Sequence, residues 1–112
     1  MEHRIDRNIN RLVSIELKES KKYYEETFNS VHEGYAIIAE EFEEAESELR
    51  RVRDTVEALW DDIKEDSIDY DFIVNVTKME LFAKRLASEA IQVSAMAKKM
   101  IESVEMMYED CD

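Results

Sequence analysis

Apolar residues return to one side of a helix along the first quarter of the chain. Most of them are three or four residues apart, the spacing that brings side chains to one face of an α-helix: Ile5, Ile9, Leu12, Val13, Leu17, Tyr24 and Phe28. The residues between them are mainly charged or polar. This pattern predicts a first helix from about residue 5 to about residue 28.

A second helix is predicted from residue 30 to about residue 64. Ser30 precedes Glu33 by three residues, which is the capping-box spacing, in which each side chain accepts a hydrogen bond from a backbone N–H at the helix start. An apolar stripe follows in alternating steps of three and four residues, as in a core-facing or coiled-coil seam: Tyr35, Ile38, Phe42, Ala45, Leu49, Val52, Val56, Leu59 and Ile63.

A third helix is predicted after the polar segment "KEDSIDYD", in which Ser67 and Asp69 are candidate N-caps. Its apolar stripe consists of Phe72, Val76, Met79, Phe82, Leu86, Val93, Met96 and Met100. Residues 106–112 are rich in methionine and acidic side chains, and we expect this acidic tail to fray.

The composition favours an all-α fold. The chain has 112 residues, one glycine and no proline, so we expect one domain over residues 1–112, built from three long helices. At 1.5 Å per residue the second helix would be roughly 50 Å long, which is more than the helices of a small monomer can cover. We therefore expect dimerisation or tetramerisation to complete a helical bundle.

The formal charge of -13 narrows the possible partners. A field of this sign repels phosphate backbones and anionic lipid, so neither nucleic acid nor a membrane is expected as a partner. The N-terminal segment "MEHRIDRNIN" has no apolar core of the kind found in signal peptides, and a cytoplasmic location is the expectation. Cys111 is the one cysteine, which leaves no second thiol for a disulfide or a thiolate metal site.

Six glutamates lie between residues 40 and 48, and they are not equivalent on a helical projection. Glu41 and Glu44 lie beside the apolar stripe at i and i+3, whereas Glu40 and Glu43 project further toward water. Two carboxylates at that spacing can converge on a hard cation such as Mg²⁺. A solvated acidic face is the competing interpretation.

Glu89 falls in the middle of the apolar stripe of the third helix. Burying an uncompensated carboxylate costs several kcal/mol, so this side chain must be paired, protonated or bound to a cation. An ion pair with Arg85, four residues earlier, or with a basic residue of another helix is the alternative to a cation site.

The segments "HEGYAIIAEEFEEAESEL" and "ASEAIQVSAMAKKMI" together resemble the MazG-like nucleotide pyrophosphohydrolases, in particular the short single-domain forms of phages and bacteria. The resemblance covers residues 30–102. Glu40, Glu41 and Glu44 match the family's E-E-x-x-E pattern, and Glu89 begins its E-x-x-D pattern. The resemblance implies an oligomeric all-α enzyme that uses Mg²⁺, with Mn²⁺ as the alternative, to split nucleoside triphosphates into monophosphate and pyrophosphate. The metal ligands that it implies are Glu41, Glu44, Glu89 and Gln92.

Position 92 departs from that pattern, because it holds Gln where the family has Asp. A Gln carbonyl can bind Mg²⁺, but the site loses one negative charge, which Glu48 or Glu40 would have to supply. For catalysis, Glu40 is the candidate that orients or deprotonates the attacking water. The candidates for substrate binding are three basic side chains and one aromatic ring that could instead belong to the core: Lys78, Lys84, Arg85 and Trp60. Tyr35 is a second ring of this kind.

Two functions therefore remain open at the level of sequence. The first is a Mg²⁺-dependent nucleoside triphosphate pyrophosphohydrolase, for example one that removes unwanted nucleotides. The second is a non-catalytic, oligomeric helical interaction protein with a degenerate metal site. A four-helix di-iron protein is disfavoured, because neither His3 nor His32 has a Glu three residues before it.

Overall fold

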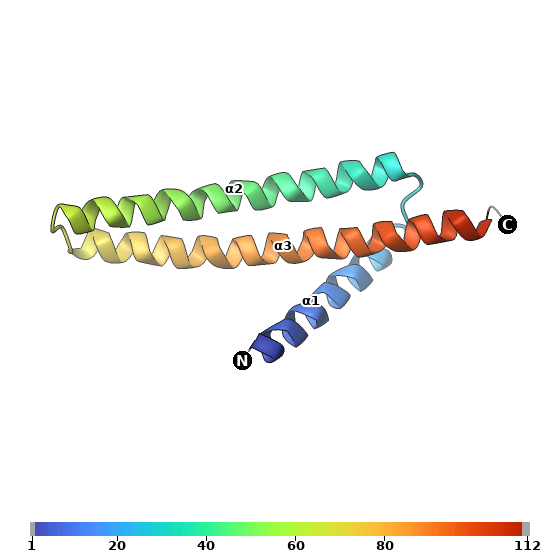
Figure 1. The fold of residues 1–112 in the computed structure, drawn as a ribbon, viewed down its shortest axis with the longest axis horizontal. Coiled ribbons are helices and arrows are strands. Elements are labelled where there is room, and N and C mark those ends of the chain that lie inside the picture. Colours follow the sequence, from blue (N-terminus) through green and yellow to red (C-terminus); the bar gives the residue numbers. More distant parts are fainter. Residues whose placement is uncertain (1, 111–112) are drawn as a thin grey trace. The chain divides into compact units, whose positions relative to one another are not determined.

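The computed structural model describes residues 2–110 and contains three helices over that range, with no strand. They are α1 (Glu2–Tyr23), α2 (Val31–Lys64) and α3 (Tyr70–Asp110) (Figure 1). The prediction of an all-α chain with three helices is confirmed. No helix in the described range is long and apolar enough to cross a membrane.

The contacts within the chain divide it into two units. The first unit comprises Met1–Phe42 and Ala90–Asp112, and it contains α1, the start of α2 and the second half of α3. The second unit is the helical hairpin Glu43–Glu89, formed by the rest of α2, the connecting turn and the first half of α3.

Helix α1 ends at Tyr23, five residues earlier than predicted. The backbone N–H of Tyr24 still donates to the Ser20 carbonyl at 2.9 Å, after which the chain leaves the helix. Phe28 is buried in the first unit, and its N–H donates to Ser103 Oγ at 2.9 Å. This hydrogen bond to a residue 75 positions away satisfies the backbone N–H of Phe28 without a helix. Phe28 is therefore a buried residue of the linker and not part of the apolar stripe of α1.

The start of α2 is fixed by local hydrogen bonds, as the capping box predicts. Ser30 Oγ accepts from the backbone N–H of Glu33 at 3.1 Å. The Glu33 carboxylate does not return to Ser30 but accepts from Asn29, at 3.0 Å from Nδ2 and 3.5 Å from the backbone nitrogen. The helix therefore begins at Val31 and continues to Lys64, close to the predicted range.

The turn between α2 and α3 closes the hairpin of the second unit. Asp66 has a φ of 56°, and its N–H donates to the Ile63 carbonyl at 3.1 Å. The N–H of Ser67 donates to the Asp62 carbonyl at 2.8 Å, which completes a Schellman motif at the end of α2. Of the two predicted caps of α3, Asp69 fills the role, because its Oδ1 accepts from the Phe72 N–H at 3.2 Å.

The first unit has a small core in which polar groups are buried beside apolar ones. Its buried side chains include Val13, Phe28, Ala95, Lys99 and Ser103. A Cβ built on Gly34 would lie 2.5 Å from Met100 Cε and 2.9 Å from Phe28 Cδ2, so a larger residue at this position would force both side chains to shift. Much of the apolar stripe predicted for α2 nevertheless lies on the surface of the chain.

The last turns of α3 overlap the acidic tail that was predicted to fray. The helix continues through Asp110, and residues 111–112, including Cys111, lie outside the described residues. Fraying of residues 106–112 in solution stays a prediction.

Candidate metal centre

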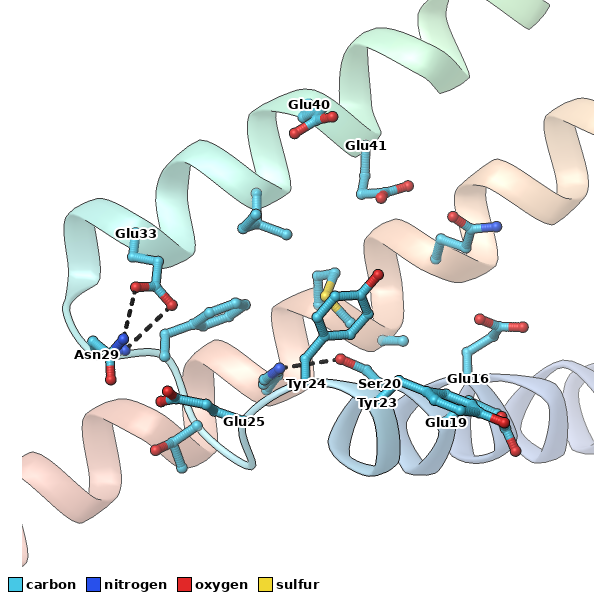
Figure 2. Close-up of a pocket in the computed structure, with 17 residues that line it drawn as sticks. Glu16, Glu19, Ser20, Tyr23, Tyr24, Glu25, Asn29, Glu33, Glu40 and Glu41 are labelled. Atoms are coloured by element: carbon cyan, nitrogen blue, oxygen red, sulfur yellow. Dashed lines mark hydrogen bonds between the residues drawn. The ribbon is translucent and has the colours of Figure 1, made fainter.

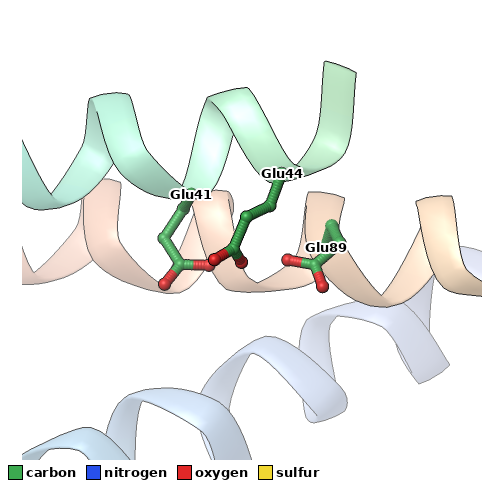
Figure 3. Close-up of side chains that lie close together, drawn as sticks. All are labelled: Glu41, Glu44 and Glu89. Atoms are coloured by element: carbon green, nitrogen blue, oxygen red, sulfur yellow. The ribbon is translucent and has the colours of Figure 1, made fainter. Parts of the chain in front are cut away.

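Glu44 and Glu89 bring two carboxylates together within the second unit. Glu44 lies on α2 and is exposed, Glu89 lies on α3 and is half-buried, and one oxygen of each lies within 4.8 Å of the other. Glu41 comes from the turn of α2 directly before Glu44, and its oxygen lies within the same distance of the Glu44 oxygen. Figure 3 shows the carboxylates of Glu44 and Glu89, which come from α2 and α3.

The separation of these oxygens fits a divalent cation of the Mg²⁺ type. Ligand oxygens around an octahedral Mg²⁺ are roughly 3 Å apart when adjacent and roughly 4 Å apart when opposite, given bonds of about 2 Å. A limit of 4.8 Å therefore requires only small rotations of the glutamate side chains. Because Glu44 is exposed, water can complete the coordination shell. The donor set, with oxygen ligands only, matches the preference of hard cations.

Three of the predicted site residues line a cavity of the first unit: Glu40, Glu41 and Gln92. It has a volume of about 650 Å³ and lies between α1, the start of α2 and the second half of α3 (Figure 2). Aromatic side chains, Tyr23 and Tyr24, contribute to its wall at the end of α1. Sequence reasoning did not identify either tyrosine as a site residue, because it predicted that the first helix continues past both of them to about residue 28.

Most of the charge that lines this cavity is negative. The carboxylates that line it are Glu16, Glu19, Glu25, Glu33, Glu40 and Glu41. Lys99 is the cation in the lining, and it is buried, with Nζ donating to Ser20 Oγ at 3.1 Å and lying 4.9 Å from the centre of the Phe28 ring. An anionic ligand would therefore need a metal ion to offset this charge.

Burial lowers the pKa of Lys99 from its ordinary value of 10.5. The charge of Glu33 opposes this shift, Lys21 adds to it, and Glu25 opposes it more weakly. The ammonium group of Lys99 is held mainly inside the first unit, where α1 and the linker cover it, and not at a surface that solvent can reach freely.

None of the residues predicted to bind substrate lines this cavity. Tyr35 lies in the first unit, and the others lie in the second: Lys78, Lys84, Arg85 and Trp60. Lys78 is exposed, Lys84 pairs with Glu80 at 2.8 Å, and the Arg85 guanidinium lies 6.0 Å from the centre of the Phe82 ring. Trp60 is exposed, with Lys64 Nζ 5.9 Å from its ring. Trp60 and Tyr35 are therefore not core residues of the chain, and their roles in substrate binding stay predictions.

The remaining glutamates of the acidic run behave differently from one another. Glu46 pairs with Arg50 at 3.5 Å on the exposed side of α2, and Glu43 is exposed. Glu48 pairs through Oε1 with Arg51 at 2.6 Å, while its Oε2 is buried without a hydrogen-bond donor among residues 2–110. Glu48 thus remains a candidate for the carboxylate that Gln92 does not supply.

Comparisons with models of known protein families, with curated proteins and with solved structures found no significant match.

Proposed function

We propose that the protein is a Mg²⁺-dependent nucleoside triphosphate pyrophosphohydrolase. The observation that carries the proposal is the convergence of Glu44 and Glu89, from two helices, next to Glu41 one turn away. The order and spacing of these residues are also the features by which the sequence resembles the MazG-like enzymes. Gln92, the implied fourth ligand, follows Glu89 by one turn of α3 and lines the same cavity as Glu41.

In this proposal Glu41, Glu44 and Glu89 would hold the cation, and Gln92 would add a neutral oxygen ligand. A divalent cation bound there would supply the positive charge that offsets the triphosphate and polarises its phosphoryl oxygens. Water adds to one phosphorus atom of the α–β linkage, and the bridging oxygen leaves with the other phosphoryl group. Glu40, which is exposed and lines the cavity, accepts the proton of the attacking water. The products are the nucleoside monophosphate and pyrophosphate.

The direct test is release of pyrophosphate from a panel of nucleoside triphosphates in the presence of Mg²⁺ or Mn²⁺. Glu44→Gln and Glu89→Gln should abolish release, because each removes a charged ligand and leaves the side-chain volume nearly unchanged. Glu43→Gln is the matched control, since Glu43 is an exposed glutamate on the same helix, and it should retain activity within a few-fold. Equal activity in all three variants contradicts the proposed site.

Metal affinity provides a second readout that does not depend on turnover. Calorimetric titration with Mn²⁺ should show weaker binding in Glu44→Gln and Glu89→Gln. It should show tighter binding in Gln92→Asp, which restores the fourth carboxylate. If Gln92→Asp leaves the affinity unchanged, Gln92 is not a ligand.

The alternative is a non-catalytic helical interaction protein in which the cation has only a structural role. The observation that favours it is the exposed row of large apolar side chains on α2. This alternative predicts Mn²⁺ binding that depends on Glu44 and Glu89, without pyrophosphate release from any nucleotide.

A further inference from the structure

The apolar stripe of α2 consists of two rows with different surroundings. The inner row is half-buried by the chain itself: Ile38, Ala45, Val52 and Leu59. The outer row is exposed, at 71%, 55%, 53%, 48% and 48% of the residue surface: Tyr35, Phe42, Leu49, Val56 and Ile63. Neighbours in the outer row are all seven residues apart, and a strict seven-residue repeat is the signature of a helix that packs along another helix.

We propose that a second copy of this chain covers the outer row, with the two α2 helices packed antiparallel about a twofold axis near Leu49. A twofold interface uses one surface twice, so that surface must be complementary to itself when reversed. The sizes of the outer-row side chains meet this condition. Reversal about Leu49 places the large rings of Tyr35 and Phe42 against the smaller Ile63 and Val56 of the second copy.

The charges beside the outer row favour the antiparallel arrangement over the parallel one. The residues four positions after each of the first four outer-row members are Ala39, Glu46, Arg53 and Trp60. Antiparallel pairing sets Glu46 near Arg53 of the second copy, twice across the axis, and sets the small Ala39 near Trp60. Parallel pairing would place the Glu46–Arg53 rows of the two copies on opposite sides of the interface, so it would not form these charge pairs.

The size of the surface suits a stable dimer. Aromatic side chains bury about 150–250 Å² each when fully covered, and aliphatic ones somewhat less, so five outer-row residues and Trp60, each about half exposed or more, offer roughly 600 Å² per copy. Specific interfaces bury about 800 Å² per partner. The flanking charged side chains supply the difference. A hollow lined by Glu46, Leu49, Arg50 and Arg53 lies at the proposed axis.

The first experiment measures the mass of the full chain by sedimentation equilibrium at micromolar concentration. The wild-type chain should be dimeric or larger, and Leu49→Glu should raise the dissociation constant at least tenfold, because the axis brings two new carboxylates together. Ile101→Glu is the control, since Ile101 is equally exposed but lies on α3. Circular dichroism checks that each variant stays helical. A monomeric wild-type chain, or a dimer that only Ile101→Glu disrupts, overturns the proposal.

The second experiment tests the orientation in a Cys111→Ser background. Phe42→Cys and Val56→Cys chains are prepared separately, mixed and oxidised. Antiparallel packing predicts a disulfide between one chain of each kind, whereas parallel packing predicts only disulfides between identical chains. Exchange of charge adds a matched test: Glu46→Arg and Arg53→Glu each weaken the dimer, and the double variant restores it. Disulfides between identical chains only, or no restoration, overturn the antiparallel arrangement. Neither readout requires catalytic activity.

Discussion

At the scale of single residues, the first unit depends on two polar side chains of α3 that are almost fully buried. Ser103 is 1% exposed, accepts from the Phe28 N–H and donates to the Lys99 carbonyl at 2.7 Å. Lys99 is 3% exposed and reaches Ser20 on α1. These bonds join the linker and α1 to α3, so the fold of this unit relies on hydrogen bonds as well as on apolar contacts.

Because Lys99 is buried, the stability of the chain should depend on pH in the alkaline range. Because burial lowers its pKa in the folded chain below 10.5, the unfolded chain binds more protons in the interval between the two values. The free energy of unfolding therefore rises with pH across that interval. Below the lowered pKa, Lys99 is charged in both states, and the cost of burying its charge is present in full.

The measurement is the urea midpoint as a function of pH, compared with two variants. Lys99→Met keeps the length of the side chain and removes its charge, so it should be more stable than the wild-type chain near neutral pH and lose this rise. Lys98→Met removes the neighbouring, exposed lysine and should keep the rise. If the urea midpoint of Lys99→Met still rises with pH, the rise comes from other groups.

At the scale of secondary-structure elements, the residue that ends α2 lowers the stability of the fold. Asp66 adopts a left-handed conformation that glycine adopts without strain, and its negative charge lies at the C-terminus of a helix, where the dipole disfavours it. Asp66→Gly should raise the free energy of unfolding by about 1 kcal/mol. Urea denaturation measures the change. Glu57→Gly, at an exposed position inside α2, should lower the free energy of unfolding by about 1 kcal/mol. Glycine should therefore stabilise the fold at position 66 and destabilise it at position 57.

The elements also show which features of the fold local sequence can predict. The starts of α2 and α3 follow from Ser30 and Asp69, because a cap acts on a backbone N–H only a few residues away. The end of α1 could not be predicted, because Phe28 has helical spacing in the sequence but is held outside the helix by Ser103, 75 residues later. No local pattern contains that contact.

The candidate site divides in the same way. Helical periodicity alone places Glu41 and Glu44 on one side of α2, and it marks Glu89 as unusual among its apolar neighbours. The approach of Glu89 to Glu44 depends on how the hairpin aligns α2 with α3, which the length of the turn and the packing determine together. The tyrosines of the cavity depend on where α1 ends, and that end was predicted wrongly.

At the scale of the whole molecule, the chain has 28 acidic and 15 basic residues, so its formal charge is -13 even when every basic residue is counted. Pairs such as Lys21 with Glu102 and Lys84 with Glu80 are partly or largely exposed, and exposed pairs contribute about 0–1 kcal/mol each. Repulsion among the excess carboxylates acts over the whole chain and opposes the compact state. The folded protein should therefore be less stable at low ionic strength than at high ionic strength.

The last prediction is that sodium chloride raises the melting temperature. Between roughly 0.01 M and roughly 1 M salt the Debye length falls from about 30 Å to about 3 Å, which screens repulsion between distant carboxylates more than attraction within contacting pairs. The rise should be several degrees, because 1 kcal/mol corresponds to about 4 °C or more for a chain of this size. Calorimetry at one fixed protein concentration measures it, since association also shifts the transition. Glu43→Gln combined with Glu57→Gln removes two of 28 acidic residues and changes the charge from -13 to -11, so its response to salt should be smaller. A melting temperature that falls as salt increases would mean that ion pairs outweigh the net repulsion.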